Sequence, residues 1–554
     1  MSFLIRGNGL RLGSTNRVSI FLTLAVTIVA SSCAGESFKG GNKTRQPEAD
    51  STQQPGTLPE SDLPKSCVPE PLPTSVVTPR KLFTYLPVGD SAPFNEFVST
   101  VAVGRLKKED ATPSILAIGM KKASTVNGRL DCSGAVFDPG RLFAIDGKTG
   151  AHKWIGRTAA GATAPVPVDV DAVVAPAIAD INGDGKMEVF AIERTTGFVV
   201  AFDSDGVVIW KSPVSTGSRS GPGSSLGVAS MWAHGISIND LDNDGVPEVV
   251  APGMVLDSRS GAKKFDLPKG RHVYPANVNL SGDSEIVVST GVVSAAGATI
   301  CEFSKALANI GIARLKKSDN FLTVVGPSLS TQESPGVQLM AYRADTCGLL
   351  FEKPLGDAGG GPPNIADFDG APDQNLEIGI AGQTRYAVFN SSGTLLWSRP
   401  TRDASSARTG STAFDFNGDG KTEVVYNDEL FLRVFDGASG TVLYEAPNTS
   451  YTAHEYPVVA DVDGNGTANI VAVSNDCANP SGNVGVNVFS EPDDHWVRTR
   501  PVWSQHGFDA LGINDDGTVT MVDPVKILAG ALPSAHLVGF RNNIPYPRDP
   551  AQCR

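Results

Sequence analysis

The feature that most restricts the fold of this chain is a repeating unit of short apolar runs separated by Asp- and Gly-rich turns. Each unit has an apolar run, an Asp-rich loop, a second and a third run, a tight turn, and a fourth run that ends in an aromatic residue. Residues 175–210, 361–397 and 410–444 show this pattern, and about eight units fit into the chain. The Asp-rich loops begin at Asp180, Asp240, Asn279, Asp367, Asp415 and Asp461. A period of about 36–60 residues is typical of a repeat architecture.

The composition of the apolar runs predicts β-strands. Runs such as EVFAIE, EVVAPG and EVVYND are short and dominated by β-branched residues, and no long amphipathic helix is evident among them. Because a single four-stranded sheet cannot bury both of its faces, repeated sheets of this kind pack side by side around an axis. We therefore predict an all-β fold, a seven- or eight-bladed β-propeller. The number of blades stays open because the strand that closes the ring cannot be recognised.

Four of the Asp-rich loops share a nine-position pattern, D-x-[DN]-x-[DN]-G-x-x-[EN], that predicts calcium binding. They are Asp180-Asn182-Asp184-Glu188, Asp240-Asp242-Asp244-Glu248, Asp415-Asn417-Asp419-Glu423 and Asp461-Asp463-Asn465-Asn469. The alternate positions place side-chain oxygens on one side of a tight loop, and the ninth position adds a ligand from the next strand. Hard oxygen donors with two to four carboxylates suit Ca²⁺, which we predict as the cofactor.

An EF-hand is excluded because position 12 of these loops is never Glu and the flanks are strands. The alternative interpretation is that the loops are Asx-rich turns without metal. The Asp461 loop has Asn at two ligand positions and should bind more weakly. The Asp367 loop, with Asp369, Asp373 and Glu377, carries two extra residues and is either a distorted site or a relic. The short Asn279 loop is expected to be empty.

The N-terminus has the pattern of an export signal. Arg6, Arg11 and Arg17 precede an apolar stretch, residues 18–30, that is too short for a permanent membrane span, and Ala-Ser-Ser leads into Cys33. Small residues before a Cys resemble the lipobox of bacterial lipoproteins, so we predict a signal peptide over residues 1–32 and lipidation of Cys33. The alternative is ordinary signal-peptide cleavage. Since Asp does not follow the Cys, the sorting rule of enterobacteria implies an outer-membrane lipoprotein on the cell surface or the periplasmic face.

The remaining organisation follows from composition. Residues 33–80 are rich in Pro, Ser and Gln and predict a disordered tether, 81–525 the propeller, and 526–554 a C-terminal tail that packs on it. Six cysteines other than Cys33 are compatible with up to three disulfides in an oxidising compartment. These six are Cys67, Cys132, Cys301, Cys347, Cys477 and Cys553.

Several segments resemble one known family. LEIGIAG, RTGSTAFDFNGDGKTEVVY, LRVFDGASGTVLYE and EYPVVADVDGNG are similar to FG-GAP, or VCBS-type, repeats of exported bacterial proteins, which are related to the integrin α propeller. The resemblance covers about residues 97–525. It implies a propeller, Ca²⁺ in the blade loops and an extracellular or surface location. It implies no single activity, because members serve adhesion, scaffolding and carbohydrate-related roles.

The function expected from these features is a binding or adhesion module, or a scaffold, and not an enzyme. The net charge of −13 and the lack of a basic run argue against nucleic acid as a partner, which leaves the membrane, through the lipid anchor, and a protein or polysaccharide. The alternative is a propeller enzyme, because LFAIDGKTGAHKW resembles quinoprotein propellers and carbohydrate-active relatives exist. The segment DDHWVRTRPVWSQHG is either a binding face or, as we favour, a cap on the last blade.

Overall fold

The computed structural model describes residues 78–121, 125–126, 129–130, 139–161, 164–216, 235–268, 272–279, 282–329, 336–520 and 539–546. The predicted signal peptide, Cys33 and most of the predicted tether lie outside these residues. The described strands all belong to one compact unit, Pro64–Arg554. Strands dominate it, and a single turn of 3-10 helix, η2 (Gly89–Ser91), is its sole helical element among the described residues. No helix in this part of the chain is long and apolar enough to cross a membrane.

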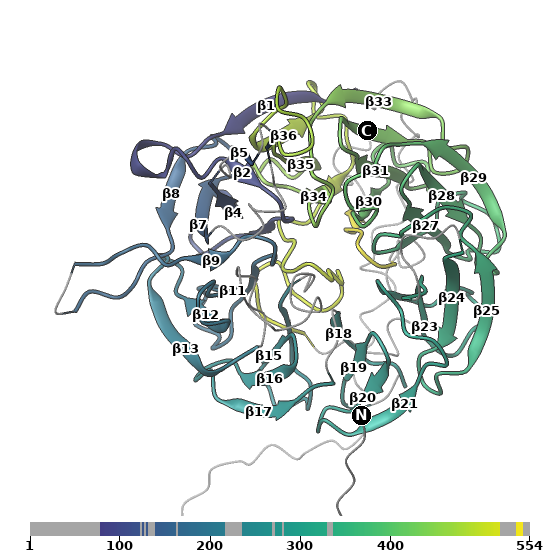
Figure 1. The fold of residues 1–554 in the computed structure, drawn as a ribbon, viewed down its shortest axis with the longest axis horizontal. Coiled ribbons are helices and arrows are strands. Elements are labelled where there is room, and N and C mark those ends of the chain that lie inside the picture. The colour runs from purple at the N-terminus through teal and green to yellow at the C-terminus, as the bar shows by residue number, and fades with distance from the viewer. Residues whose placement is uncertain are drawn as a thin grey trace, which may run out of the picture. The chain divides into compact units, whose positions relative to one another are not determined.

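The strands form eight antiparallel blades of a β-propeller, numbered here in chain order (Figure 1). The strands of each blade are given from the innermost outward. Blade 1 contains β3 (Ala102–Gly104), β4 (Ser114–Met120), β7 (Pro139–Asp146) and β8 (His152–Ile155), and blade 2 contains β10 (Ala177–Ala179), β11 (Glu188–Ile192), β12 (Phe198–Phe202) and β13 (Val208–Ser215). Blade 3 contains β14 (Ser237–Asn239), β15 (Glu248–Ala251), β16 (Met254–Asp257) and β17 (Lys263–Asp266), and blade 4 contains β18 (Val273–Ala276), β19 (Glu285–Val288), β20 (Gly291–Val293) and β21 (Thr299–Glu302). Blade 1 also holds β2 (Glu96–Phe97) and β9 (Val170–Asp171), and β5 (Thr125–Val126) pairs with β6 (Arg129–Leu130).

The second half of the ring repeats this arrangement. Blade 5 contains β22 (Gly311–Ala313), β23 (Thr323–Pro327), β24 (Gln338–Arg343) and β25 (Leu349–Pro354), and blade 6 contains β26 (Asn364–Ala366), β27 (Glu377–Ala381), β28 (Arg385–Phe389) and β29 (Leu395–Pro400). Blade 7 contains β30 (Ser411–Phe414), β31 (Glu423–Asn427), β32 (Phe431–Phe435) and β33 (Val442–Pro447), and blade 8 contains β34 (Val458–Ala460), β35 (Asn469–Ser474), β36 (Gly485–Ser490) and β1 (Arg80–Tyr85). The two inner strands of most blades are buried along their whole length, as in β11 and β31, whereas the outermost strands are half exposed. The apolar core therefore lies between the blades.

The ring is closed by the two ends of the repeat region. Strand β1 pairs antiparallel with β36, with Arg80 opposite Ser490 and Tyr85 opposite Val486, and becomes the outermost strand of blade 8. This pairing selects eight blades from the two numbers that the sequence allowed. It also ties the start of the propeller to its end, so that the two ends of the repeat region cannot separate without breaking the sheet of blade 8.

One contact recurs between neighbouring blades. An aromatic residue on the outermost strand of one blade lies against a glycine in the outer hairpin of the next, and this glycine has positive φ. The pairs are Phe83 with Gly150, Trp154 with Gly206, Trp210 with Gly261, Phe265 with Gly297, Phe351 with Gly393, and Trp397 with Gly440. A Cβ on Gly440 would lie 2.4 Å from the Trp397 ring, so both the turn and the ring require glycine there.

Between blades 4 and 5 a disulfide takes the place of this contact. Cys301 stands on β21 where the other blades have the aromatic residue, and Cys347 stands in the next hairpin where they have glycine. Cys347 keeps the positive φ of that position, 54°. The two cysteines are bonded to one another, and Cys477 is disulfide-bonded as well. Disulfides of this kind form and persist in oxidising compartments.

Replacing both cysteines of this bridge by serine should lower the free energy of unfolding by about 2–4 kcal/mol, because the bridge restricts a 46-residue loop of the unfolded chain. Urea unfolding of the double variant Cys301→Ser, Cys347→Ser without reductant measures the loss. Reductant should reduce the stability of the wild type and leave the variant less affected. An unchanged midpoint in the variant would show that packing alone joins blades 4 and 5.

The C-terminal segment lies inside the ring, drawn in yellow in Figure 1. Trp503 exchanges two backbone hydrogen bonds with Val103 of blade 1, and the carbonyl of Ser504 accepts one from Ile178 of blade 2. Further along the chain, Phe540 pairs with Ile365 of blade 6. The strands β37 (Arg498–Thr499) and β38 (Pro545–Tyr546) join the two parts of this segment. The expected cap on the last blade is thus a larger structure, which contacts the inner strands of blades on both sides of the axis.

Side chains at the axis are buried, and several of their polar groups are hydrogen-bonded. Arg541 is fully buried and donates to Tyr274 Oη at 3.0 Å and to His506 O at 3.2 Å. Trp503 is fully buried and stacks on Phe508 at 4.4 Å between ring centroids. Asn543 Nδ2 donates to the carbonyls of Val459 and Val502. Trp496, Trp503, Arg500 and Arg541 are therefore packed inside the propeller, whereas Arg498 of the same segment is exposed.

Candidate metal loops

The Asp-rich loops connect the two innermost strands of their blades. In blade 2 the loop begins with Asp180 after β10 and ends with Glu188, the first residue of β11. The glycine at the sixth position has positive φ in all four pattern loops, from 79° at Gly185 to 90° at Gly466. Only glycine adopts this conformation without cost, so the predicted turn forms where the pattern placed it.

The first Asp of each pattern loop organises the loop backbone. In blade 7, Asp415 Oδ1 accepts hydrogen bonds from the N–H groups of Gly418 and Asp419, and Oδ2 accepts one from Gly420 at 3.0 Å. Asn417 Oδ1 accepts from Asp419 N–H at 3.0 Å. The Asp180, Asp240 and Asp461 loops repeat the bond from the sixth-position N–H. These bonds bend the chain into a tight loop, and in the Asp240 loop the carboxylates at positions 1, 3 and 5 lie within 4.8 Å of one another.

The ninth residue closes each loop in the same way. One of its side-chain oxygens accepts a hydrogen bond from the N–H group of the residue that follows the first loop position. In blade 4 this donor is Val278, so the loop there begins at Asn277 and not, as the sequence predicted, at Asn279. The acceptors are Glu188, Glu248, Glu285, Glu377, Glu423 and Asn469, paired with Ile181, Leu241, Val278, Phe368, Phe416 and Val462. In the glutamates this bond uses Oε2 and leaves Oε1 for the centre of the loop. The loops therefore differ in the side chain that contacts Oε1 of the ninth residue.

In three loops no cationic or amide side chain reaches the ninth residue. Within the described residues, no ammonium, guanidinium or side-chain amide group hydrogen-bonds to Glu188, Glu377 or Glu423. Burial, reinforced by the neighbouring Asp carboxylates, raises the pKa of Glu188 to about 7, that of Glu377 to about 8 and that of Glu423 well above its usual range. Glu423 is only 2% exposed. A buried carboxylate without a positive partner is the arrangement that a bound cation would stabilise.

Without metal, the protein should become more stable as the pH falls from about 8 to about 4.5, as far as these three glutamates determine it. In this range the folded chain holds protons on Glu188, Glu377 and Glu423 that the unfolded chain, with ordinary Glu pKa values, has released. Because the folded state binds more protons, its free energy of unfolding rises as the pH falls. Urea unfolding of chelator-treated protein measures the slope. In the variant with Gln at positions 188, 377 and 423, the free energy of unfolding should depend less on pH. An equal pH dependence in the variant and the wild type would contradict the raised pKa values of these three glutamates.

The Asp367 loop in blade 6 keeps a convergent donor set despite its two extra residues. Carboxylate oxygens of Asp367, Asp369 and Glu377 lie within 4.8 Å of one another. Burial also raises the pKa of Asp367 to about 6. Asp373, which the sequence placed in the donor set, instead accepts hydrogen bonds from Asn375. The insertion thus removes one predicted donor and leaves three carboxylates able to hold a cation.

The Asp240 loop in blade 3 already contains a cation. The carboxylates of Asp240, Asp242 and Asp244 converge within 4.8 Å of one another. Lys264, on the outermost strand β17, donates to Glu248 Oε1 at 2.6 Å and to Asp242 Oδ2 at 3.2 Å. Sequence reasoning missed this lysine because it lies outside the nine-position pattern.

Two other loops are closed by amide groups. In blade 4, Asn279 Nδ2 donates to Glu285 Oε1, and the expectation that this loop is empty stays a prediction. In blade 8, Asn469 uses Oδ1 to accept from Val462 N–H at 2.8 Å, which turns its Nδ2 toward the loop. That Nδ2 is buried and has no hydrogen-bond partner. Since an N–H group cannot ligate a cation, the Asp461 loop retains no ligand at its ninth position.

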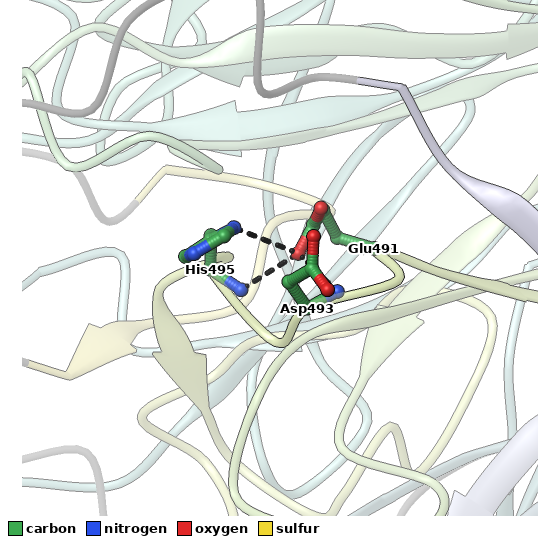
Figure 2. A group of neighbouring side chains, drawn as sticks. All are labelled: Glu491, Asp493 and His495. Carbon is green, nitrogen blue, oxygen red and sulfur yellow. Dashed lines mark hydrogen bonds and ion pairs between the residues drawn. The ribbon is translucent and has the colours of Figure 1, made fainter.

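A further acidic group lies in the loop after β36 and was not predicted as a metal site. Figure 2 shows Glu491, Asp493 and His495, whose potential ligand atoms lie within 4.8 Å of one another. Glu491 Oε2 accepts from the N–H groups of Asp493 and His495, and it lies 3.3 Å from His495 Nδ1. The buried carboxylate of Glu491 is therefore used to hold the loop that leads into Trp496. We assign this group a structural role.

The comparisons with known proteins agree with this architecture. Residues 180–251 match the FG-GAP-like repeat family, and the search of curated proteins found no match. The structure is similar to that of the V. cholerae biofilm matrix protein Bap1, with a TM-score of 0.67 and 18% identity over 85% of this chain and 100% of that chain. Rhamnogalacturonan lyase YesW and the Bacillus licheniformis rhamnogalacturonan lyase PL11 share 16% and 15% identity, with TM-scores of 0.47 and 0.49, over 74% of this chain and 75% of theirs. The chain is an eight-bladed β-propeller, and residues 180–251 of it match the FG-GAP-like repeat family.

Proposed function

We propose that this chain is an exported, calcium-stabilised propeller that acts as a binding or scaffold module at the cell surface. The observation that carries the proposal is the filled axis. Trp503, Phe508 and Arg541 of the chain's own C-terminal segment are buried at the place where a propeller could otherwise hold a ligand. A partner would therefore contact the outer surfaces of the blades.

Calcium in this proposal is structural. The residues that would hold it are Asp180, Asn182, Asp184 and Glu188 in blade 2; Asp415, Asn417, Asp419 and Glu423 in blade 7; and Asp367, Asp369 and Glu377 in blade 6. The support is the buried carboxylate at the ninth position of each loop, which has no positive side chain beside it. A bound divalent cation would offset the repulsion among these carboxylates and fix the connection between the two inner strands of the blade.

The proposed location rests on the N-terminal sequence and on the oxidised cysteines. A signal peptide followed by Cys33 supports export and attachment to the outer membrane by a lipid anchor. The bond between Cys301 and Cys347 supports a compartment outside the reducing cytosol. The stretch between the lipid and the propeller would act as a spacer that lets the folded unit reach a partner.

The rim of the propeller offers an apolar surface for such a partner. The outermost strands of blades 5, 6 and 7 follow one another along the rim in Figure 1. Their exposed large apolar residues are Leu349, Leu350, Leu395, Leu396 and Val442. Grouped apolar residues on an otherwise polar surface are typical of interaction sites. We propose a protein or polysaccharide partner, and since the V. cholerae protein of similar fold is described as a biofilm matrix protein, extracellular polysaccharide is the first candidate.

The experiment combines location with binding. Cells that produce the wild type or Cys33→Ser are labelled with palmitate, fractionated and treated with protease from outside. The wild type should carry label and occur in the outer-membrane fraction, and Cys33→Ser should do neither. Purified protein is then tested for retention of extracellular polysaccharide, with Leu350→Asp and Leu396→Asp as variants. An unlabelled wild type would contradict the lipid anchor, and equal retention by wild type and variants would contradict the rim site.

A further inference from the structure

Every outermost strand of the propeller contains a β-bulge at the same place. One extra residue stands between the end of the outer hairpin and the aromatic position, so that the register shifts there. In chain order the extra residues are Leu82, Lys153, Ile209, Lys264, Ile300, Leu350, Leu396 and Leu443. The position is apolar in six blades and lysine in two. Bulges redirect a side chain, and this one lies on the same side of the blade as the Asp-rich loop.

In blade 3 the lysine at the bulge reaches the centre of the loop. Lys264 Nζ lies 2.6 Å from Glu248 Oε1 and 3.2 Å from Asp242 Oδ2, and its side chain is 34% exposed. Glu248 is almost fully buried, and its other oxygen is held by Leu241 N–H at 2.9 Å. The ammonium group thus binds the two carboxylates, at positions 3 and 9, that a calcium ion in this loop would need.

Blade 1 shows the same arrangement in a loop that has lost its acidic pattern. Lys153 Nζ donates to Ser114 Oγ at 2.9 Å and to Asp110 Oδ2 at 3.3 Å. Ser114 is the first residue of β4, and so it stands where Glu188 stands in blade 2. Two independent blades therefore bring the bulge lysine to the ninth loop position. In blades 2, 6 and 7, where the bulge residue is Ile209, Leu396 or Leu443, no lysine bonds to that position within the described residues.

The geometry points to an internal ammonium that replaces calcium in the Asp240 loop: Lys264 fills the loop of blade 3, although this loop matches the calcium pattern with four carboxylates. The inference rests on the proposed function, because it takes calcium binding by the other loops as its reference. It means that the residue at the bulge selects between a metal-bound blade and a lysine-closed blade. Blade 3 should consequently keep its structure when calcium is scarce.

The test is the number of calcium ions bound by the full chain, measured by equilibrium dialysis and by isothermal titration calorimetry. Lys264→Met removes the ammonium group and keeps an apolar stem, and it should bind one more equivalent of calcium than the wild type. Ile209→Lys places a lysine at the bulge of blade 2, and it should bind one equivalent fewer. Lys263→Met is the matched control, because the neighbouring Lys263 pairs with Asp266 on the same strand and should leave the number unchanged.

Thermal unfolding supplies a second measurement that does not depend on stoichiometry. In chelator, Lys264→Met should unfold at a lower temperature than the wild type, since four carboxylates lose their cation, and calcium should restore it. Equal numbers of bound ions in wild type and Lys264→Met would overturn the inference, as would an extra equivalent in Lys263→Met. If neither the wild type nor any variant binds calcium, the proposed calcium sites themselves are wrong. This outcome differs from the two above, in which the wild type binds calcium.

Discussion

Chelation of calcium should lower the midpoint of thermal unfolding of this protein by roughly 8 °C. A ligand present at about 100 times its dissociation constant stabilises the folded state by about 2.7 kcal/mol for each site. An unfolding entropy of about 2.1 cal/mol/K per residue converts this free energy into about 3 °C per site for a folded unit of this size. Three loops, those that begin at Asp180, Asp367 and Asp415, should contribute. Scanning calorimetry with calcium and with chelator measures the shift.

The controls for this result are variants of the ninth loop position. The triple variant Glu188→Gln, Glu377→Gln and Glu423→Gln should lose most of the response to calcium, because each amide group removes a ligand charge from one loop. Glu302→Gln, which changes an exposed residue of an outermost strand, should keep the full response. A wild type that unfolds at the same temperature in calcium and in chelator would show that the loops are Asx-rich turns only, while the propeller itself would stand.

Trp503→Ala should lower the free energy of unfolding by about 3–5 kcal/mol, the usual loss when a buried aromatic residue is truncated. Trp503 is fully buried, stacks on Phe508 and lies 6.3 Å from the ring of Tyr456, between centroids. Its removal would leave a void between the C-terminal segment and the inner strands. Urea unfolding followed by circular dichroism measures the loss, and Trp503→Phe should lose less.

Leu395→Ala is the control for the truncation of Trp503. Leu395 is a large apolar residue on an outermost strand with 46% of its surface exposed, so its truncation should change stability by less than about 0.5 kcal/mol. If Trp503→Ala is as stable as Leu395→Ala, the C-terminal segment does not fill the axis in solution. The binding proposal would then lose its main support, because an open axis could hold a ligand.

Local patterns in the sequence were sufficient to predict the blades and the loop geometry. The period of the apolar runs predicts four-stranded units, because strand length and turn composition are encoded residue by residue. The pattern from Asp180 to Glu188 predicts the loop for the same reason. The glycine at its sixth position and its Asp residues shape the loop within nine residues of chain, so no contact with a distant segment has to be known. The number of blades and the pairing of the two bridging cysteines could not be predicted from such local patterns.

The tertiary structure decided the features that depend on residues far apart in the chain. Ring closure joins Arg80 to Ser490, and no local signal marks the first strand as part of the last blade. Lys264 reaches Glu248 only because a bulge on β17 turns it toward the loop. The segment around Trp503 enters the axis because backbone groups of inner strands, such as those of Val103 and Ile178, hydrogen-bond with it there. The sequence by itself thus determined the repeating unit and its Asp-rich loop pattern, since both are local. The closure, the filled axis and the group that contacts the ninth residue of each loop depend on packing between distant segments.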